Sequence, residues 1–72
     1  MKVTLHAAER FLERVFGMDH YSKKEKYRAI ALLEKEVRDI VVVGKKRMFV
    51  LPSFPQARAV FFDNTIVTIL AK

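Results

Sequence analysis

Apolar residues recur every three or four positions between His6 and Phe16, the spacing that places them on one side of an α-helix. At 100° per residue they cover one broad arc, and the opposite side is polar. Gly17 follows directly, and glycine is the residue that most often ends a helix. We therefore predict a first helix over residues 6–16, with one broad apolar arc formed by Ala8, Phe11, Leu12, Val15 and Phe16.

A second helix is indicated by its start signal. Ser22 followed by Glu25 is a capping-box pattern, in which the hydroxyl accepts from the Glu25 N–H and the carboxylate accepts from the Ser22 N–H. Apolar positions then repeat at helical spacing as far as Arg38, where we expect the helix to end. Its predicted buried seam consists of Tyr27, Ile30, Leu33 and Val37, widened by Ala29 and Leu32.

Beyond Arg38 the pattern becomes that of β-strands, with β-branched and aromatic residues between short turns. A further short extended stretch precedes the first helix and is expected to form an edge strand. The turns are predicted at Gly44–Lys45 and at Asp63–Asn64. The predicted strands cover residues 2–5, 40–43, 47–51, 58–62 and 65–70.

These elements follow one another in the order β-α-α-β-β-β-β. At 72 residues the chain has core for only one domain, which spans residues 1–72. We expect an α+β fold, in which two N-terminal helices pack on a twisted antiparallel sheet. The last four strands should form a meander because their connections are short.

The loop Pro52-Ser53-Phe54-Pro55 interrupts this series, because proline lacks the N–H that a central strand needs. Phe54 has two interpretations. It is either an exposed platform on which a nucleic-acid base stacks, or a core plug that holds the loop down.

Charge narrows the range of partners. The chain has a formal net charge of +6, of which residues 45–72 contribute +4. A basic sheet region suits a polyanion such as RNA, or an acidic protein. The alternative is that the positive charge only keeps a small domain soluble.

Several kinds of chemistry are not expected. The chain has no cysteine, which excludes disulfides and thiolate catalysis and fits a reducing cytoplasm. His6 and His20 lie far apart without clustered carboxylates, so we expect no metal site and no cofactor. The apolar runs are far shorter than the roughly 20 residues of a membrane span, and no membrane association is expected.

The candidate functional residues are basic or polar. His6 and Arg10 are four apart on one helix face, with Arg14 one turn further, so an imidazole and guanidinium groups could meet a phosphate there. The alternative is an ordinary solvated helix face. Arg58 shares a strand face with Val60 and Phe62 and either lines a concave surface or is an edge arginine lying over apolar neighbours.

Lys45-Lys46-Arg47 forms a basic turn that runs into a strand. Such a turn is either a solvated loop tip or an edge that contacts phosphates. In the second case it would add affinity and salt sensitivity without sequence preference.

Two segments resemble known nucleases. Residues 4–14 are similar to the T-x-H-A-x-x-R-x-x-x-R opening of small proteins related to the barnase, EndoU, colicin and RelE group. Residues 56–70 are similar to the strand, turn and final strand of RelE-like toxins. Together these segments cover about half of the chain, but the further basic and aromatic residues that RelE-like toxins often carry at the C-terminus are missing.

The resemblance implies a RelE-like fold and cleavage of RNA without a metal, in which the ribose 2′-OH attacks the adjacent phosphorus. It implies His6 as acid or base, Arg10 and Arg58 on the phosphate, and Thr68 as a hydrogen-bonding aid. An acidic antitoxin protein would then be a partner besides RNA. The second hypothesis is a non-catalytic module from a mobile element, which holds nucleic acid or protein on the same basic face.

Overall fold

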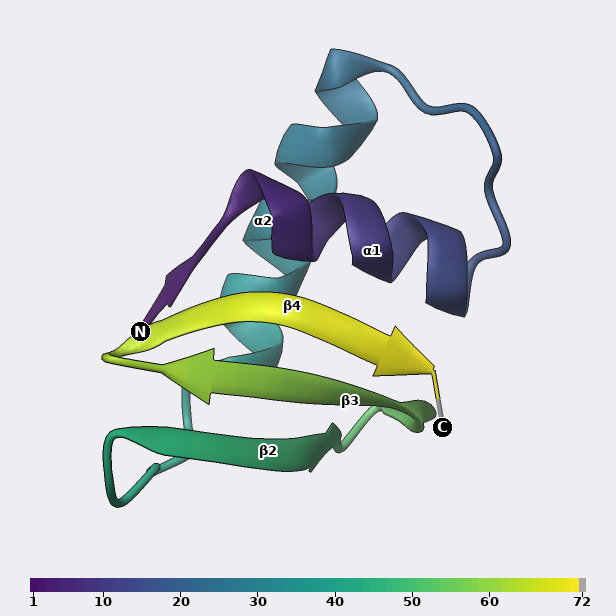
Figure 1. The fold of residues 1–72 in the computed structure, drawn as a ribbon. Helices are drawn as coiled ribbons and strands as arrows, with labels where there is room; N and C mark the ends of the chain where they lie inside the picture. The colour runs from purple at the N-terminus through teal and green to yellow at the C-terminus, as the bar shows by residue number, and fades with distance from the viewer. Residues whose placement is uncertain (72) are drawn as a thin grey trace.

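The chain folds into two helices and a four-stranded sheet, described for residues 1–71 of a computed structural model (Figure 1). The strand order in the sheet is β1-β4-β3-β2. The α+β class and the order of helices before the main strands are confirmed. The elements are β1 (Lys2–Val3), α1 (Leu5–Val15), α2 (Lys23–Val37), β2 (Lys46–Leu51), β3 (Phe54–Phe62) and β4 (Thr65–Ala71).

The second helix begins at the predicted cap, whereas the first begins at Thr4, in the stretch predicted as an edge strand that reaches only Val3. The Thr4 hydroxyl accepts from the Ala7 N–H at 3.0 Å and starts α1, which ends before Gly17, a residue with φ of +65°. Ser22 and Glu25 form both hydrogen bonds of the capping box at the start of α2. The local signals therefore predict the helix limits to within one residue.

The sheet is antiparallel from β2 through β3 to β4, as predicted, and β1 adds to it in parallel with β4. The β3–β4 turn has left-handed backbone at Asp63 (φ 50°) and Asn64 (φ 62°), the conformation of a tight hairpin turn. A register shift lies between Val60 and Phe61, which pair with Thr68 and Ile66. The extra residue in β4 lets Ile66 and Ile69 both point toward the helices although they are three apart.

One core joins the helices to one face of the sheet. Ala7 and Ala8 of α1 are fully buried, as are Ala57 and Ala59 of β3, and these small side chains allow close approach of the two layers. Phe54 packs edge-to-face on Phe11, with ring centroids 5.1 Å apart, so it is a core plug and not a free stacking platform. In Figure 1 α1 lies above β4, and α2 crosses behind the sheet.

Two predictions about single elements were wrong. Residues 40–43 do not pair in the sheet and form the connection between α2 and β2. Tyr27 and Leu32 are exposed, because the buried seam of α2 narrows to Ala29, Leu33 and Val37. A helix packed on one partner layer needs only a narrow apolar stripe.

Pro55 lies inside β3, which sequence reasoning did not expect of a central strand. The sheet register explains this position: Ala57 pairs with Ala71 at the end of β4, so β4 does not reach Pro55. At that point β3 has only β2 beside it within residues 1–71, and the register shift between Val50 and Leu51 leaves Pro55 without a partner in β2. In the described residues no helix is long and apolar enough to cross a bilayer.

Phe61 and Phe62 allow a direct test of the two sheet faces, because their exposed fractions are 5% and 45%. Phe61→Ala should lower the free energy of unfolding by about 3–5 kcal/mol. Phe62→Ala should lower it by less than about 1 kcal/mol. Urea unfolding followed by circular dichroism measures both, and equal losses would contradict this assignment of the faces.

Candidate functional site

The face of the sheet that points away from the helices is defined here as the open sheet face. Buried residues alternate along β3, which places Arg58, Val60 and Phe62 on this face, as predicted for Arg58. The register brings neighbouring strands into line with them. The open sheet face consists of Lys46, Met48 and Val50 of β2, Arg58, Val60 and Phe62 of β3, and Thr68 and Leu70 of β4.

Positive charge stands at both ends of this face. Arg58 pairs with Leu70 at one end, and Lys46 pairs with Phe62 at the other. The Lys45 ammonium lies 5.7 Å from the centre of the Phe62 ring, a cation–π distance. Phe62 lies four steps along the extended strand from Arg58, or about 13 Å. The surface between them is largely apolar, and Met48, Val50 and Phe62 are exposed.

A second arginine, Arg14 of α1, lies at the outer edge of β4. β1 pairs only with Thr65 and Ile66, and side chains from the start and the end of α1 meet β4 further along. The Thr4 hydroxyl donates to the Val67 carbonyl at 3.3 Å, and the Arg14 guanidinium donates to the Ile69 carbonyl at 2.8 Å.

Arg14 and Arg58 therefore belong to one corner of the sheet. Ile69 precedes Leu70, the register partner of Arg58, and neighbouring strands lie about 5 Å apart. A guanidinium has five N–H donors, so Arg14 keeps its charge and most of its donors while it holds the Ile69 carbonyl. Arg58 and Thr68 lie on the open sheet face near this corner, and Arg14 reaches the adjacent outer edge of β4 from the helix layer.

Arg10 has a different environment from the one predicted. Its guanidinium donates to Glu13 Oε2 at 3.0 Å, and the same oxygen accepts from the Tyr21 hydroxyl at 2.5 Å. Both members of the ion pair have side chains about one third exposed. The charge of Arg10 is therefore largely balanced by Glu13, and the helix residue that reaches the sheet is Arg14.

His6 is exposed near the start of α1, on the same helical stripe as Arg10 and Arg14. The other side of α1 faces α2, where Glu9 pairs with Lys26 at 3.2 Å. Two helical turns separate His6 from Arg14, or about 12 Å along the axis. Lys45, Lys46 and Arg47 are exposed at the far end of the sheet, and Arg47 Nε donates to the Val43 carbonyl at 2.8 Å.

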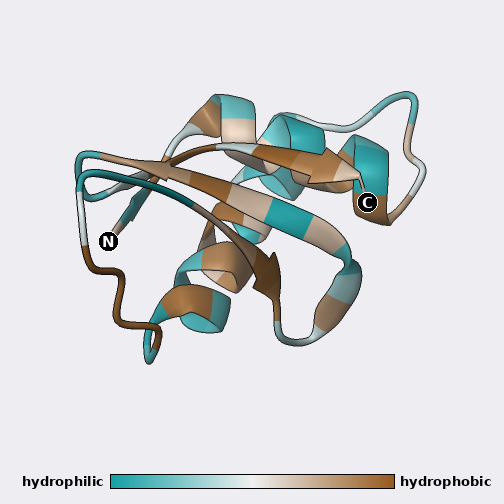
Figure 2. Ribbon diagram, turned by 60° about the horizontal axis from the view of Figure 1, so that its bottom comes forward, coloured by the Kyte–Doolittle hydropathy of each residue, from teal (hydrophilic) through white to brown (hydrophobic). Residues whose placement is uncertain are grey.

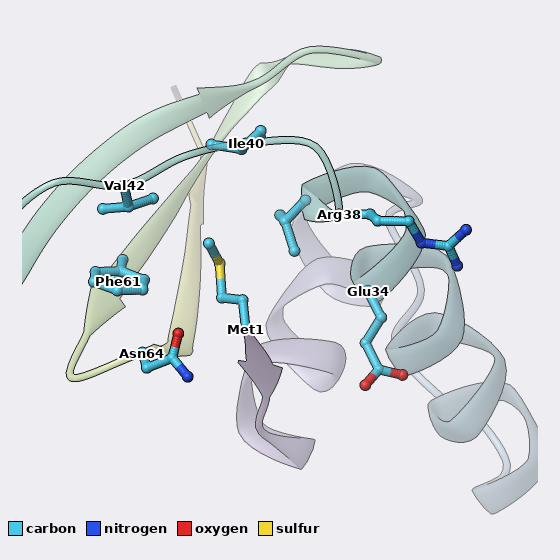
Figure 3. A pocket seen from close by; sticks show the side chains of 8 residues that line it. Met1, Glu34, Arg38, Ile40, Val42, Phe61 and Asn64 are labelled. Atoms are coloured by element: carbon cyan, nitrogen blue, oxygen red, sulfur yellow. The ribbon is translucent and has the colours of Figure 1, made fainter.

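A cavity of about 350 Å³ lies elsewhere, between the end of α2 and the sheet (Figure 3). Within residues 1–71 its lining includes none of the predicted catalytic side chains. The predicted catalytic residues His6, Arg10, Arg58 and Thr68 therefore lie outside this cavity. The cavity is lined by Met1, Glu34, Val37, Arg38, Ile40, Val42, Phe61 and Asn64.

Sequence reasoning missed Tyr21, which lies in the loop between the helices and has no periodic pattern to place it. The Arg10–Glu13 pair had a signal, because residues three apart on a helix are neighbours. For Arg14 the signal was its place at the flank of the apolar arc, which directs it toward the sheet edge.

Comparison of the chain with protein-family models, curated proteins and solved structures finds no match.

The Tyr21 hydroxyl gives a pH-dependent test of this network. Its hydrogen bond to Glu13, followed by desolvation and the negative charges of Glu13 and Glu9, raises the pKa of Tyr21 above 10.0. A raised pKa means that the hydrogen bond stabilises the fold below pH 10 and is lost as the pH rises through the folded-state value. The wild-type protein should therefore melt at a higher temperature than Tyr21→Phe, by an amount that is constant from pH 7 to about 10 and shrinks at higher pH.

Tyr27→Phe, on the exposed side of α2, is the matched control and should follow the wild-type curve throughout. A melting-temperature difference between wild type and Tyr21→Phe that stays constant above pH 10 would contradict a raised pKa of Tyr21 in the folded state.

Proposed function

We propose that this protein binds single-stranded RNA across the open sheet face. The observation that supports the proposal most directly is the corner where Arg14 donates to Ile69 and Arg58 stands opposite Leu70. Arg58 can hold a phosphate with paired donors on the open sheet face, and Arg14 of α1 adds a second guanidinium at the neighbouring edge of β4. Lys45 and Lys46 supply a second cationic position at the other end of the face.

The surface between these cations favours unpaired RNA over a duplex. Phe62 offers an exposed ring, and Met48 and Val50 offer exposed apolar area beside it. Unpaired bases have free faces that stack on such groups, whereas a duplex presents mainly phosphates and ribose. A duplex would leave this apolar area in contact with water.

The second candidate function is metal-independent RNA cleavage, which is favoured by the exposed His6 on the same helix stripe as Arg14. In this reaction the imidazole takes the proton of the ribose 2′-OH, whose oxygen attacks phosphorus. The bond from phosphorus to the 5′-oxygen breaks, and that oxygen takes up a proton. Arg14 and Arg58 would stabilise the charge of the phosphorane, with Thr68 as a hydrogen-bond donor.

The ion pair of Arg10 with Glu13 bears on the choice between the two functions. The charge of Arg10 is engaged by Glu13, and neither His6 nor Arg58 lines the cavity at the end of α2. Binding alone needs only the surface cations, so we put binding first. An acidic antitoxin would compete for these cations and stays a prediction.

Binding should depend on Arg14 and Arg58 in a salt-dependent way. For a fluorescein-labelled single-stranded RNA, Arg58→Ala should weaken binding about tenfold at low salt, because a phosphate contact is lost. The slope of log Kd against log salt should fall by about 0.7, and Arg14→Ala should act in the same direction. Fluorescence anisotropy across a salt series measures both quantities.

Arg28→Ala, an exposed arginine on α2, is the control and should change affinity by much less. The proposal fails when Arg58→Ala has the affinity and the salt slope of the wild type. Duplex RNA of the same length should bind more weakly than the single strand.

Cleavage is tested separately by incubation of the protein with RNA in EDTA. His6→Ala should abolish the 2′,3′-cyclic phosphate products while the melting temperature stays the same, since His6 is exposed. His20→Ala is the matched exposed-histidine control and should cleave normally. Salt-sensitive binding without any product would leave a binding module and remove the nuclease hypothesis.

A further inference from the structure

Residues Ile40–Val43 form a strand-like segment that belongs to no sheet. Burial alternates along it: Ile40 and Val42 are partly buried, whereas Val41 is 87% and Val43 71% exposed. Ile40 and Val42 line the cavity behind the sheet and pack on the core (Figure 3). The segment appears in Figure 2 as the brown connection from α2 to the sheet.

The backbone of this segment is available for pairing. Within residues 1–71 the N–H groups of Val41, Val42 and Val43 have no hydrogen-bond acceptor. Both ends are held, because Arg47 Nε donates to the Val43 carbonyl and Ile40 N donates to Val37 O at 3.1 Å. Four consecutive β-branched residues strongly favour strand structure, yet within residues 1–71 they have no strand paired with them.

A groove of about 360 Å³ runs beside the segment. It is lined by residues 40–43 together with Arg47, Met48 and Phe49 of the outermost strand, β2. An added strand would pair with the backbone of the segment and insert alternate side chains into this groove. The groove is apolar apart from Arg47, so the inserted side chains should be aliphatic.

Charge identifies the kind of strand that fits. Residues 38–47 carry Arg38, Lys45, Lys46 and Arg47 against Asp39, a formal +3 out of the total of +6. A second copy of this chain would bring two such positive segments together, which is unfavourable. A strand with acidic residues at its ends would pair its carboxylates with the flanking bases.

We propose that residues Ile40–Val43 are a docking site for an extended segment of another protein, with aliphatic side chains in the middle and acidic residues at both ends. This site lies on the helix side of the β2 edge, away from the Arg14–Arg58 corner. It does not rest on RNA binding.

The test uses the full chain and a short fluorescein-labelled peptide in which valine and threonine alternate between glutamates at both ends. The peptide should bind, and a version N-methylated at alternate backbone amides should not, because methylation removes the donors that pair strands. Val41→Asn should raise Kd at least about tenfold, which is about 1.4 kcal/mol. Tyr27→Asn, which removes an exposed apolar side chain from α2, should leave Kd unchanged.

Four results would overturn the proposal: no binding of the acidic peptide, equal binding of a lysine-ended peptide, binding that survives N-methylation, or binding that survives Val41→Asn. Sedimentation that shows a dimer of the chain, broken by Val41→Asn, would assign the segment to a second copy instead. Arg58→Ala should leave peptide affinity unchanged, so failure of the RNA proposal and failure of this one are distinguishable.

Discussion

The packing of α1 against β4 determines how the rest of this molecule is organised. Ala7 and Ala8 are fully buried at this contact, and their small side chains let the helix backbone approach the strand closely. Thr4 and Arg14 then donate to two carbonyls of β4 beyond the short β1. A side chain larger than alanine at either position would separate the layers and break both hydrogen bonds. The helix thus closes one sheet edge and presents its basic stripe beside that edge.

In residues 1–71 both helices pack on the same side of the sheet, and no helix covers the open sheet face. The open sheet face is nevertheless apolar at Met48, Val50 and Phe62, with cations at its ends. Exposed apolar area of this kind costs solubility, and net positive charge opposes self-association. The combination is more consistent with a ligand surface than with an ordinary solvated face.

The parts of the fold that local chemistry specifies were predictable from the sequence. The capping box, Gly17 and the Asp63–Asn64 turn each depend on a few adjacent residues, and the alternation along β3 placed Arg58 on the outer face. Residues 40–43 have the composition of a strand but no partner strand within residues 1–71. Pairing depends on where the chain lies after the end of α2, which local composition does not determine. Arg10 instead donates to Glu13, whose carboxylate also accepts from the Tyr21 hydroxyl. The spacing of Arg10 and Glu13 is visible in the sequence, but the contact with Tyr21 is a tertiary one that no periodic pattern predicts.

The outer edge of β4 and residues 40–43 both lack a full partner strand, but they differ in whether their backbone groups are already hydrogen-bonded. The β4 edge is occupied by donors from Thr4 and Arg14, so another strand cannot easily add there, whereas residues 40–43 keep their amides free. Lys45 and Lys46 stand between the second stretch and the open sheet face, and they serve both proposed surfaces. An acidic strand on residues 40–43 would neutralise these lysines and weaken a polyanion on the open face. By linkage, the polyanion would weaken the strand by the same factor, so the two ligands should bind with negative cooperativity through the lysines that both contact.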